Sequence, residues 1–430
     1  MRTFAEHQHA VRELLAPLRT RLDDPAGFEA ISLADAGAGA LSRVLAVDVL
    51  SPVDLPAFAN SQMDGYAVRA SDLSAARPDS PVSLPVGVTT AAGDAVRAHA
   101  PGTASPIMTG APIPSGADAV VPIEAADPPR FAGIGSAHRD APAGTTASFG
   151  RPVDPGAFVR PAGSDVASGA PLLPAGIRLR PAQLGALAAA GVTSVAVRRP
   201  VSVILVSTGH ELRPPGEALD SGQIHDANTS MIAAALRESG ATVHASLVPD
   251  EAAAVLAAVA ASAEVVDLIV TTGGVSAGAF EVVRDAFEPL GVEFTKVAMQ
   301  PGGPQGLGTA RVPGRSGDGA ATVPVVSFPG NPVSALVSFE LFLRPVLRSL
   351  AGLAPDRSRA TLRLAHSISS PIDRHQVRRG VLDGNGDVEV GAPSSHLLHD
   401  YANATVLVHL PMGVGDLPAG ANVDVWRIDD

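Results

Sequence analysis

The chain has 430 residues, a formal net charge of −12 and no cysteine. The lack of cysteine excludes disulfide bonds, thiolate nucleophiles and metal or iron–sulfur sites with thiolate ligands. An acidic balance, with Lys296 as the only lysine, argues against general nucleic-acid binding, which needs a basic surface. The 43 glycines and 38 prolines indicate many turns, whereas the 46% hydrophobic content is enough to build folded cores.

The N-terminus is expected to form a helix rather than a targeting signal. Thr3 and Glu6 have the spacing of a capping box and precede a helical pattern of apolar residues that reaches Leu18. A signal peptide would need a charged start, an apolar run and a small-residue cleavage site, and the sequence shows none. The longest weakly polar run, Ala252–Ala263, is too short to span a bilayer. We therefore expect a cytoplasmic protein without membrane insertion.

The region that follows is rich in turns and short strands. Residues 54–150 are dense in proline and glycine, and their short β-like runs, such as Pro81–Val88 and Asp118–Ile123, predict a small β-rich domain. Residues 151–180 are again rich in turns. A helix is expected from Pro181 to Ala190.

Residues 195–350 alternate short apolar runs with helices. The runs are rich in β-branched residues, and they are Val201–Val206, Val265–Val270 and Val323–Phe328. The helices that follow them are expected to end at Ser239, to run from about Phe280 to Leu290, and to run from Val333 to Leu347. This alternation is typical of a parallel sheet covered on both faces. The last zone, 351–430, loses the helices, and its apolar runs predict a small β-barrel or sandwich.

A glycine-containing turn follows each of the three apolar runs. The turns are Ser207-Thr208-Gly209, Thr272-Gly273-Gly274-Val275-Ser276 and Pro329-Gly330-Asn331-Pro332. Ligands of open α/β sheets bind beyond the carboxyl ends of the strands, where such turns present unpaired N–H groups to anions. A single glycine turn usually only reverses the chain. Three of them, each with a Ser, Thr or Asn beside the glycine, indicate one composite site for an anionic, phosphorylated ligand.

Carboxylates stand beside the same turns. Glu211, Asp226 and Glu281 would repel an anionic ligand unless a hard cation lies between them, which suggests Mg²⁺. Taken singly, each could equally be a solvated loop carboxylate. Asp226 is the strongest candidate of the three, because it lies two residues before the expected helix N-cap, Asn228.

One short motif supports a rival interpretation. Gly274-Val275-Ser276-Ala277-Gly278 matches the Gly-x-Ser-x-Gly nucleophile elbow and lies between a strand and a helix. A serine hydrolase that uses Ser276 with Asp400 and His409 is therefore a distant alternative, although it leaves the other two turns without a role. No Gly-Lys-Ser/Thr occurs, which excludes a Walker-type phosphate loop, and no His-Glu-x-x-His occurs.

Longer motifs along the chain resemble those of one family, the molybdopterin molybdenumtransferases, which are bacterial relatives of the gephyrin E domain. The resemblance covers essentially the whole chain, and its motifs occur in the family's order. They are Ser51–Pro56, Asn60–Arg69, Ile107–Val121, Ser207–Leu212, Gly222–Asn228, Thr272–Gly278 and Phe328–Ser334.

The resemblance implies a multi-domain α/β plus β fold and a homodimer with a site shared between its subunits. Its parts would be an elongated discontinuous domain I (1–53 with 151–180), a β-rich lid domain II (54–150), a central parallel-sheet molybdopterin-binding α/β domain III (181–350) and a C-terminal β-barrel domain IV (351–430). The implied activity is the insertion of molybdate into adenylylated molybdopterin with release of AMP, in a Mg²⁺-dependent step. Its partners would be these small-molecule substrates and not nucleic acid.

The resemblance also implies roles for single residues. Asp64 matches an aspartate that reaches the site from a partner subunit's lid, with Thr109 as its neighbour, and Asp165 matches the aspartate of a Gly-Glu-Asp segment. The candidate catalytic residues are Asp64, Glu211, Asp226 and Glu281, of which the last three would also position Mg²⁺ and molybdate. The helix N-termini at Gly273–Ser276 and Gly330–Ser334 are expected to hold the pterin and its phosphate. The candidate residues for binding molybdopterin are Thr109, Asp165, Ser207, Thr208, Gly209, Thr272, Gly273, Gly274, Ser276, Pro329, Gly330, Pro332 and Ser334.

The sequence departs from the family pattern at several of these positions. His210 stands where the family usually has Asp, Ser164 where it has Glu, and Ala279 where it has an acidic residue. Gln300 and Gly303 replace two lysines that are expected to hold molybdate or phosphate. The alternative function is therefore a catalytically weak gephyrin-like paralogue, a dimeric scaffold for a partner protein such as a cell-division component.

Overall fold

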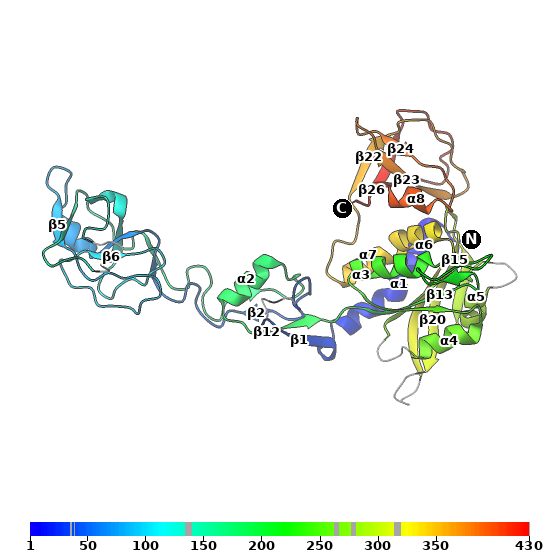
Figure 1. The fold of residues 1–430 in the computed structure, drawn as a ribbon, viewed down its shortest axis with the longest axis horizontal. Helices are drawn as coiled ribbons and strands as arrows, with labels where there is room; N and C mark the ends of the chain where they lie inside the picture. Colours follow the sequence, from blue (N-terminus) through cyan, green and yellow to red (C-terminus); the bar gives the residue numbers. More distant parts are fainter. Residues whose placement is uncertain are drawn as a thin grey trace. The chain divides into compact units, whose positions relative to one another are not determined.

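The computed structural model describes residues 1–34, 37, 39–133, 140–261, 266–276, 281–313 and 320–429. The chain divides into two compact units, drawn in Figure 1. Unit 1 consists of Met1–Glu29 and Val197–Asp430, and unit 2 consists of Ala30–Ala196. Within the described residues, no helix is both long enough and apolar enough to cross a membrane.

The centre of unit 1 is a six-stranded sheet with the order β16-β13-β17-β21-β20-β18. Its strands are β13 (Ser202–Thr208), β16 (Thr242–Val248), β17 (Leu268–Thr272), β18 (Val292–Lys296), β20 (Pro304–Pro313) and β21 (Ala320–Phe328). The strands β16, β13, β17 and β21 are parallel, as the alternation of apolar runs and helices predicts. The expectation of a parallel sheet is wrong for β20 and β18, which pair antiparallel. Only six residues of sequence join β20 to β21, too few for the crossover that a parallel pair needs, so the two strands pair with opposite directions.

Helices cover both faces of this sheet (Figure 1). One face carries α1 (Phe4–Leu22), α3 (Ala227–Glu238), α6 (Pro332–Ser338), the π-helical segment η6 (Phe339–Leu343) and α7 (Arg344–Leu350). The other face carries α4 (Ala252–Ala261) and α5 (Val282–Phe287), which the 3₁₀ turn η5 (Glu288–Leu290) follows. The expected capping box is present at the start of α1, where the Glu6 N–H donates to Thr3 Oγ1 (3.2 Å) and the Thr3 N–H donates to Glu6 Oε2 (2.8 Å).

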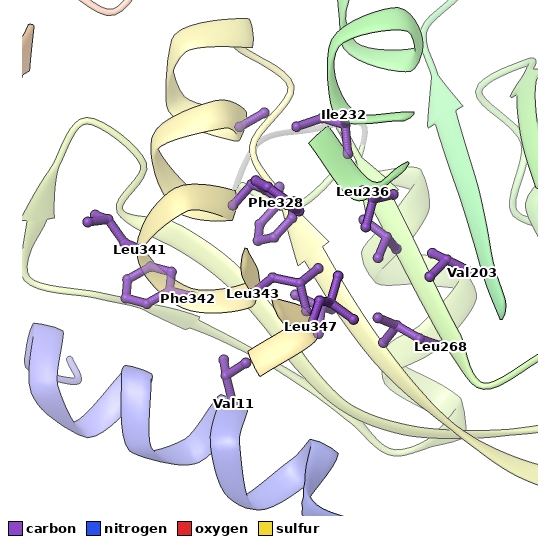
Figure 2. Close-up of a cluster of buried hydrophobic side chains, with 14 of the residues drawn as sticks. Val11, Val203, Ile232, Leu236, Leu268, Phe328, Leu341, Phe342, Leu343 and Leu347 are labelled. Carbon is purple, nitrogen blue, oxygen red and sulfur yellow. The ribbon is translucent and has the colours of Figure 1, made fainter. Parts of the chain in front are cut away.

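The larger core of unit 1 lies between the sheet and the helices α1, α3 and α7 (Figure 2). Val203, Leu268 and Phe328 come from three neighbouring parallel strands and are completely buried, together with Leu236 of α3. The next residue of β13, Ile204, belongs to the core on the opposite face. Each such side chain contributes about 1.5–3 kcal/mol when it is buried. This packing on both faces explains the continuous apolar runs and holds the strand ends from which the glycine turns start.

The C-terminal part of unit 1 forms a second sheet with the order β19-β23-β25-β26-β22, and β24 pairs with β23. Its elements are β19 (Met299–Gln300), β22 (Arg359–Arg363), β23 (His375–Leu382), β24 (Val388–Val390), α8 (Leu398–Ala402), β25 (Val406–Leu410) and β26 (Asn422–Arg427). Leu364, which follows β22, forms a single bridge with Val388 of β24, and the described strands show no ladder between β22 and β24 or between β22 and β19. A continuous ladder that closes the expected barrel is therefore not present in the described residues.

Unit 2 is built mainly from short strands. They are β2 (Val49–Leu50), β3 (Asn60–Ser61), β4 (Gly65–Val68), β5 (Val82–Pro85), β6 (Ser105–Ile107), β7 (Ala119–Pro122), β8 (Ala126–Asp127), β9 (Thr146–Phe149), β10 (Val159–Arg160) and β11 (Pro171–Leu173). The strands β6 and β7 flank β4, and β5 and β8 flank β9. The two β-like runs of the sequence contain β5 and β7. The expected helix is α2 (Pro181–Ala189), and β1 (Phe28–Ser32) and β12 (Ser194–Arg198) lie where the chain passes between the units.

Candidate functional site

The carboxyl ends of the parallel strands of unit 1 border a cleft of about 440 Å³. Its walls come from the turns after β13, β17 and β21, from residues 224–228 and from the loop after β16. The lining residues are Thr208, Gly209, Glu211, Leu212, Ile224, His225, Asp226, Ala227, Asn228, Asp250, Gly273, Gly274, Val275, Ser276, Glu281, Pro304, Pro329, Gly330 and Pro332. This volume is within the range of small-molecule sites, and its place is the usual one for a ligand of an α/β sheet.

The structure brings the three glycine turns against one another. The Gly273 N–H donates to the Phe328 carbonyl (3.1 Å), and a Cβ added to Gly330 would lie 3.2 Å from the Cα of Gly273. Gly273 has a φ of +95°, and a Cβ on it would come within 2.9 Å of the Thr208 carbonyl oxygen. Only glycine allows this backbone conformation and this close approach together. The three turns that the sequence analysis singled out thus form one wall.

Asp226 is the N-cap of α3, and both of its carboxylate oxygens bind Thr229. The Thr229 N–H donates to Oδ1 (3.1 Å) and the Thr229 hydroxyl donates to Oδ2. The helix therefore begins two residues earlier than expected, and the prediction of Asn228 as the N-cap is wrong. Asp and Asn cap helices about equally well, so the identity of the cap depends on how the chain enters the helix. Asn228 instead donates from Nδ2 to the Gly330 carbonyl (2.7 Å) and ties α3 to the third turn.

A chain of hydroxyl groups leads from Asp226 into the protein behind the cleft. The Thr229 hydroxyl lies 2.8 Å from Ser207 Oγ, and Ser207 Oγ lies 2.8 Å from Thr272 Oγ1. Ser207 and Thr272 are completely buried, and neither residue lines the cleft. Ser334 is also buried outside the lining, where its N–H donates to Asn331, the N-cap of α6. The structure therefore places these three candidate residues one layer behind the wall.

Asp250 is a fourth carboxylate of the cleft, which the sequence analysis missed. It follows β16, and its Oδ2 accepts a hydrogen bond from the His210 N–H (3.0 Å) and lies 3.2 Å from His210 Nδ1. The Thr208 hydroxyl donates to Oδ1. A carboxylate that follows a parallel strand is the sequence pattern that would have predicted Asp250. The strand itself was not predicted, because β16 is a partly exposed edge strand without a continuous apolar run.

Glu281 closes the second turn by accepting the Ser276 N–H at Oε2 (2.8 Å). The next helix, α5, begins at Val282, so the expectation of a helix N-terminus at Gly273–Ser276 is wrong. Residues 277–280, which include the departure at Ala279, lie outside the described residues.

Glu211 also lines the cleft, so its described wall carries four carboxylates. No lysine or arginine is among the residues that the structure places in this wall, and His225 is its only basic side chain. The described side chains of this wall therefore carry a net negative charge.

Neither position of the two replaced lysines lines the cleft. Gln300 lies on β19, and its Oε1 accepts a hydrogen bond from Gln376 Nε2 (2.9 Å). Gly303 bonds through its carbonyl oxygen to the Val297 N–H (2.7 Å), and the following residue, Pro304, reaches the lining. A pair of neutral amides thus occupies the place of one expected cation.

Three of the candidate residues belong to unit 2 instead of unit 1. Asp64 Oδ1 accepts hydrogen bonds from both the N–H and the hydroxyl of Thr109, each at 2.7 Å, so these two residues are neighbours. The Asp165 N–H donates to the Leu55 carbonyl (2.9 Å), next to the departure at Ser164.

The three candidate residues of a serine hydrolase, Ser276, Asp400 and His409, line three different clefts. Ser276 lines the cleft described above, whereas His409 lines a different cleft and bonds to His375 (3.1 Å). Asp400 lines a third cleft, beside Arg379. The described residues thus form no Ser-His-Asp triad from these three side chains.

Comparison with known proteins gives one family along the chain. Residues 2–191 match the model described as "MoeA N-terminal region (domain I and II)", residues 204–349 match "Probable molybdopterin binding domain", and residues 361–428 match "MoeA C-terminal region (domain IV)". Molybdopterin molybdenumtransferase 2 of Mycobacterium tuberculosis is 42% identical over 443 aligned positions, and the match covers 100% of both chains.

Two further relatives agree with these matches. Molybdopterin molybdenumtransferase of Synechococcus elongatus is 36% identical and covers 93% of this chain and 94% of its own. The crystal structure of a molybdopterin biosynthesis moea protein from Pyrococcus horikosii has a TM-score of 0.76 and 29% identity, and it covers 97% of this chain and 98% of its own. The family resemblance of the motifs is thereby confirmed, and the chain belongs to the molybdopterin molybdenumtransferase family.

Proposed function

We propose that the cleft of unit 1 binds adenylylated molybdopterin and molybdate, and that the chain transfers molybdenum to molybdopterin with release of AMP. As a member of this family, the chain is a transferase of molybdenum cofactor biosynthesis. The cleft itself is the observation that supports this assignment of the site. Three glycine turns and four carboxylates meet there at the carboxyl ends of parallel strands, which is the arrangement that an anionic ligand with a bound cation needs.

The third turn is the best placed to bind an anionic group of the substrate. Gly330 and Pro332 line the cleft beside Asn331, the N-cap of α6. Gly273 and Gly274 bring a second stretch of backbone against it. The N–H groups of Gly273, Ser276 and Ser334 are bonded within the protein, so an oxyanion would be held by other N–H groups of these turns, without adding a charged side chain. This would compensate in part for the neutral residues at positions 300 and 303.

The carboxylates fit Mg²⁺ by their chemistry. Mg²⁺ prefers oxygen ligands, and it is usually held by one or two carboxylates together with substrate phosphate oxygens and water. Within the described ranges, no group of three His, Asp or Glu side chains is placed to hold a metal. One or two of Asp226, Glu211 and Glu281 would therefore supply the carboxylates, and substrate oxygens and water would complete the coordination. The ion would offset the negative charge of phosphate and molybdate oxygens.

Unit 2 contributes to the proposal through Asp64 and Thr109. The Thr109 hydroxyl and N–H both bind Asp64 Oδ1, so the carboxylate has a defined orientation. We expect the chain to form a homodimer in which Asp64 of one subunit completes the cleft of the other subunit.

A reconstituted assay tests this function. The purified full-length chain is given adenylylated molybdopterin, molybdate and Mg²⁺, and AMP release and cofactor formation are measured. Glu211→Gln should lower kcat by about tenfold or more, a loss of at least ~1.4 kcal/mol in transition-state stabilisation. Glu217→Gln is the matched control, because Glu217 is an exposed carboxylate six residues further along the chain and outside the cleft lining. A folded dimer without AMP release would refute the enzymatic proposal and favour the scaffold function.

A further inference from the structure

A second cleft of unit 1 lies between the start of α1 and the C-terminal sheet. It has a volume of about 440 Å³ and shares no lining residue with the cleft of the proposed function. The chain contains only one tryptophan and two tyrosines. That tryptophan, Trp426, lines this second cleft together with Phe4, His375 and His409. A sequence so poor in aromatic residues thus gathers four rings around one cavity.

The four rings form a continuous wall. Phe4 is stacked on His375 with 4.4 Å between ring centroids, His375 and His409 are 5.3 Å apart, and His409 lies 4.2 Å from Trp426. The guanidinium of Arg359 lies over the Trp426 ring, 4.8 Å from its centroid. Ring-lined walls of this kind bind flat aromatic ligands through stacking and edge contacts. The same guanidinium is paired with Asp356 (3.1 Å), so Arg359 mainly fixes the position of the Trp426 ring.

A polar row crosses the same face of the sheet. Strand register places Thr361 of β22 opposite Asp424 of β26, and Asp424 opposite His409 of β25. The Thr361 hydroxyl donates to Asp424 Oδ1 (3.1 Å), which orients the exposed carboxylate. His409 is 6% exposed, and its Nε2 is buried without a hydrogen-bond partner among the described residues. The His409 Nε2 atom has almost no solvent-accessible surface, so the group of this row that an occupant can reach is the exposed Asp424 carboxylate, which accepts hydrogen bonds.

The two histidines are neutral at pH 7. Burial lowers the pKa of His375 to about 4 and that of His409 to about 3. A neutral imidazole has one N–H, so either His375 or His409 donates in the bond between His375 Nε2 and His409 Nδ1 (3.1 Å). The two histidines therefore contribute rings without positive charge, and a ligand edge that carries N–H donors can bind the Asp424 carboxylate.

We propose that this cleft binds a planar nitrogen heterocycle with an aminopyrimidine edge, the class that purine bases and pterins share. The amino group and ring N–H of such an edge would donate to the Asp424 carboxylate. The rings of Trp426 and the two histidines would contact the flat body of the ligand. The site is separate from the molybdenum-transfer cleft, so the proposal does not depend on the assignment of that cleft.

The single tryptophan makes the test direct. Adenosine, guanosine and biopterin are titrated separately into the full-length chain without molybdate, and the fluorescence of Trp426 and the heat of binding are measured. We expect saturable binding with a Kd below roughly 1 mM for at least one of the three probes. The purine and pterin titrations distinguish the two sources of the heterocycle.

Two variants and two controls locate the binding. Asp424→Asn should weaken binding about tenfold or more, and Thr361→Val, which removes the group that orients Asp424, should weaken it less. Asp416→Asn is a matched control, because Asp416 is a carboxylate of the same sheet region that bonds to Ser369 outside the cleft. Asp226→Asn in the other cleft should also leave the affinity unchanged. The proposal is refuted if no probe binds, if folded Asp424→Asn and Thr361→Val both bind as tightly as the wild type, or if Asp226→Asn abolishes binding.

Discussion

Asp226 has a structural role and a proposed chemical role, and two substitutions can separate them. Asp226→Ala removes both the N-cap of α3 and the acceptor of the Thr229 hydroxyl. Loss of an N-cap costs about 1 kcal/mol of the free energy of unfolding. A buried donor without a partner costs about 1–3 kcal/mol, but the Thr229 hydroxyl can still donate to Ser207 Oγ. We therefore expect a total loss of about 2 kcal/mol.

Asp226→Asn keeps the cap and removes the negative charge. Asn is about as good an N-cap as Asp, so the expected loss of stability is under about 1 kcal/mol. If the charge of Asp226 positions Mg²⁺ and molybdate, turnover should fall as far in this variant as in Asp226→Ala. Asp24→Ala is a matched control, because Asp24 caps a short 3₁₀ turn outside the cleft through the Ala26 N–H (2.9 Å).

The measurements are urea unfolding of each variant and AMP release at equal concentrations of folded protein. The order of stability should be wild type, Asp226→Asn and then Asp226→Ala, whereas both variants should lose turnover. Asp24→Ala should lose some stability and keep full turnover. Asp226→Asn with wild-type turnover would refute the chemical role and leave Asp226 as a helix cap alone.

Two further predictions concern the turns and the buried histidines. Gly274→Ala should destabilise unit 1 by about 1–3 kcal/mol and lower turnover, because Gly274 has a φ of +57° and a Cβ would lie 2.7 Å from the Val283 nitrogen. Gly222→Ala is the matched control, because Gly222 also has a positive φ (+86°) but an added Cβ would meet no atom within 4 Å. It measures the backbone strain alone, so an equal fall in Tm for the two variants would contradict a role for the contact with Val283. Burial lowers the pKa of His7 and His375 to about 4 and that of His409 to about 3. Below pH 6.5 these histidines therefore take up protons in the unfolded chain, while in the folded chain they stay neutral until the pH approaches 4. These groups should not affect the free energy of unfolding well above pH 6.5, but they should lower it as the pH falls towards 4, by about 2 kcal/mol per histidine at about pH 5. In His409→Gln, the urea midpoint should fall less steeply with decreasing pH than in the wild type. An equal dependence of the midpoint on pH would exclude His409 as a cause.

Local patterns in the sequence determined much of the fold and the place of the site. The capping box of Thr3 and Glu6 and the apolar runs of β13, β17 and β21 depend on residues close together in the chain, and all were predicted. The glycine turns after those runs were predicted for the same reason. Because parallel strands end at one edge of a sheet, the meeting of the turns followed from the strand pattern.

Long-range packing selects the side chains of these turns that border the cleft. Ser207 and Thr272 lie beside the glycines in sequence, but the buried ends of their strands place them behind the wall. Asp250 enters the wall because an edge strand, β16, pairs with β13, and this pairing is not readable from periodicity.

The same limit applies to the antiparallel pairing of β20 and to the contact of His375 with His409, 34 residues apart. Sequence periodicity shows which residues a strand or helix can bury. It does not show which strands become neighbours, and that depends on long-range packing and strand register.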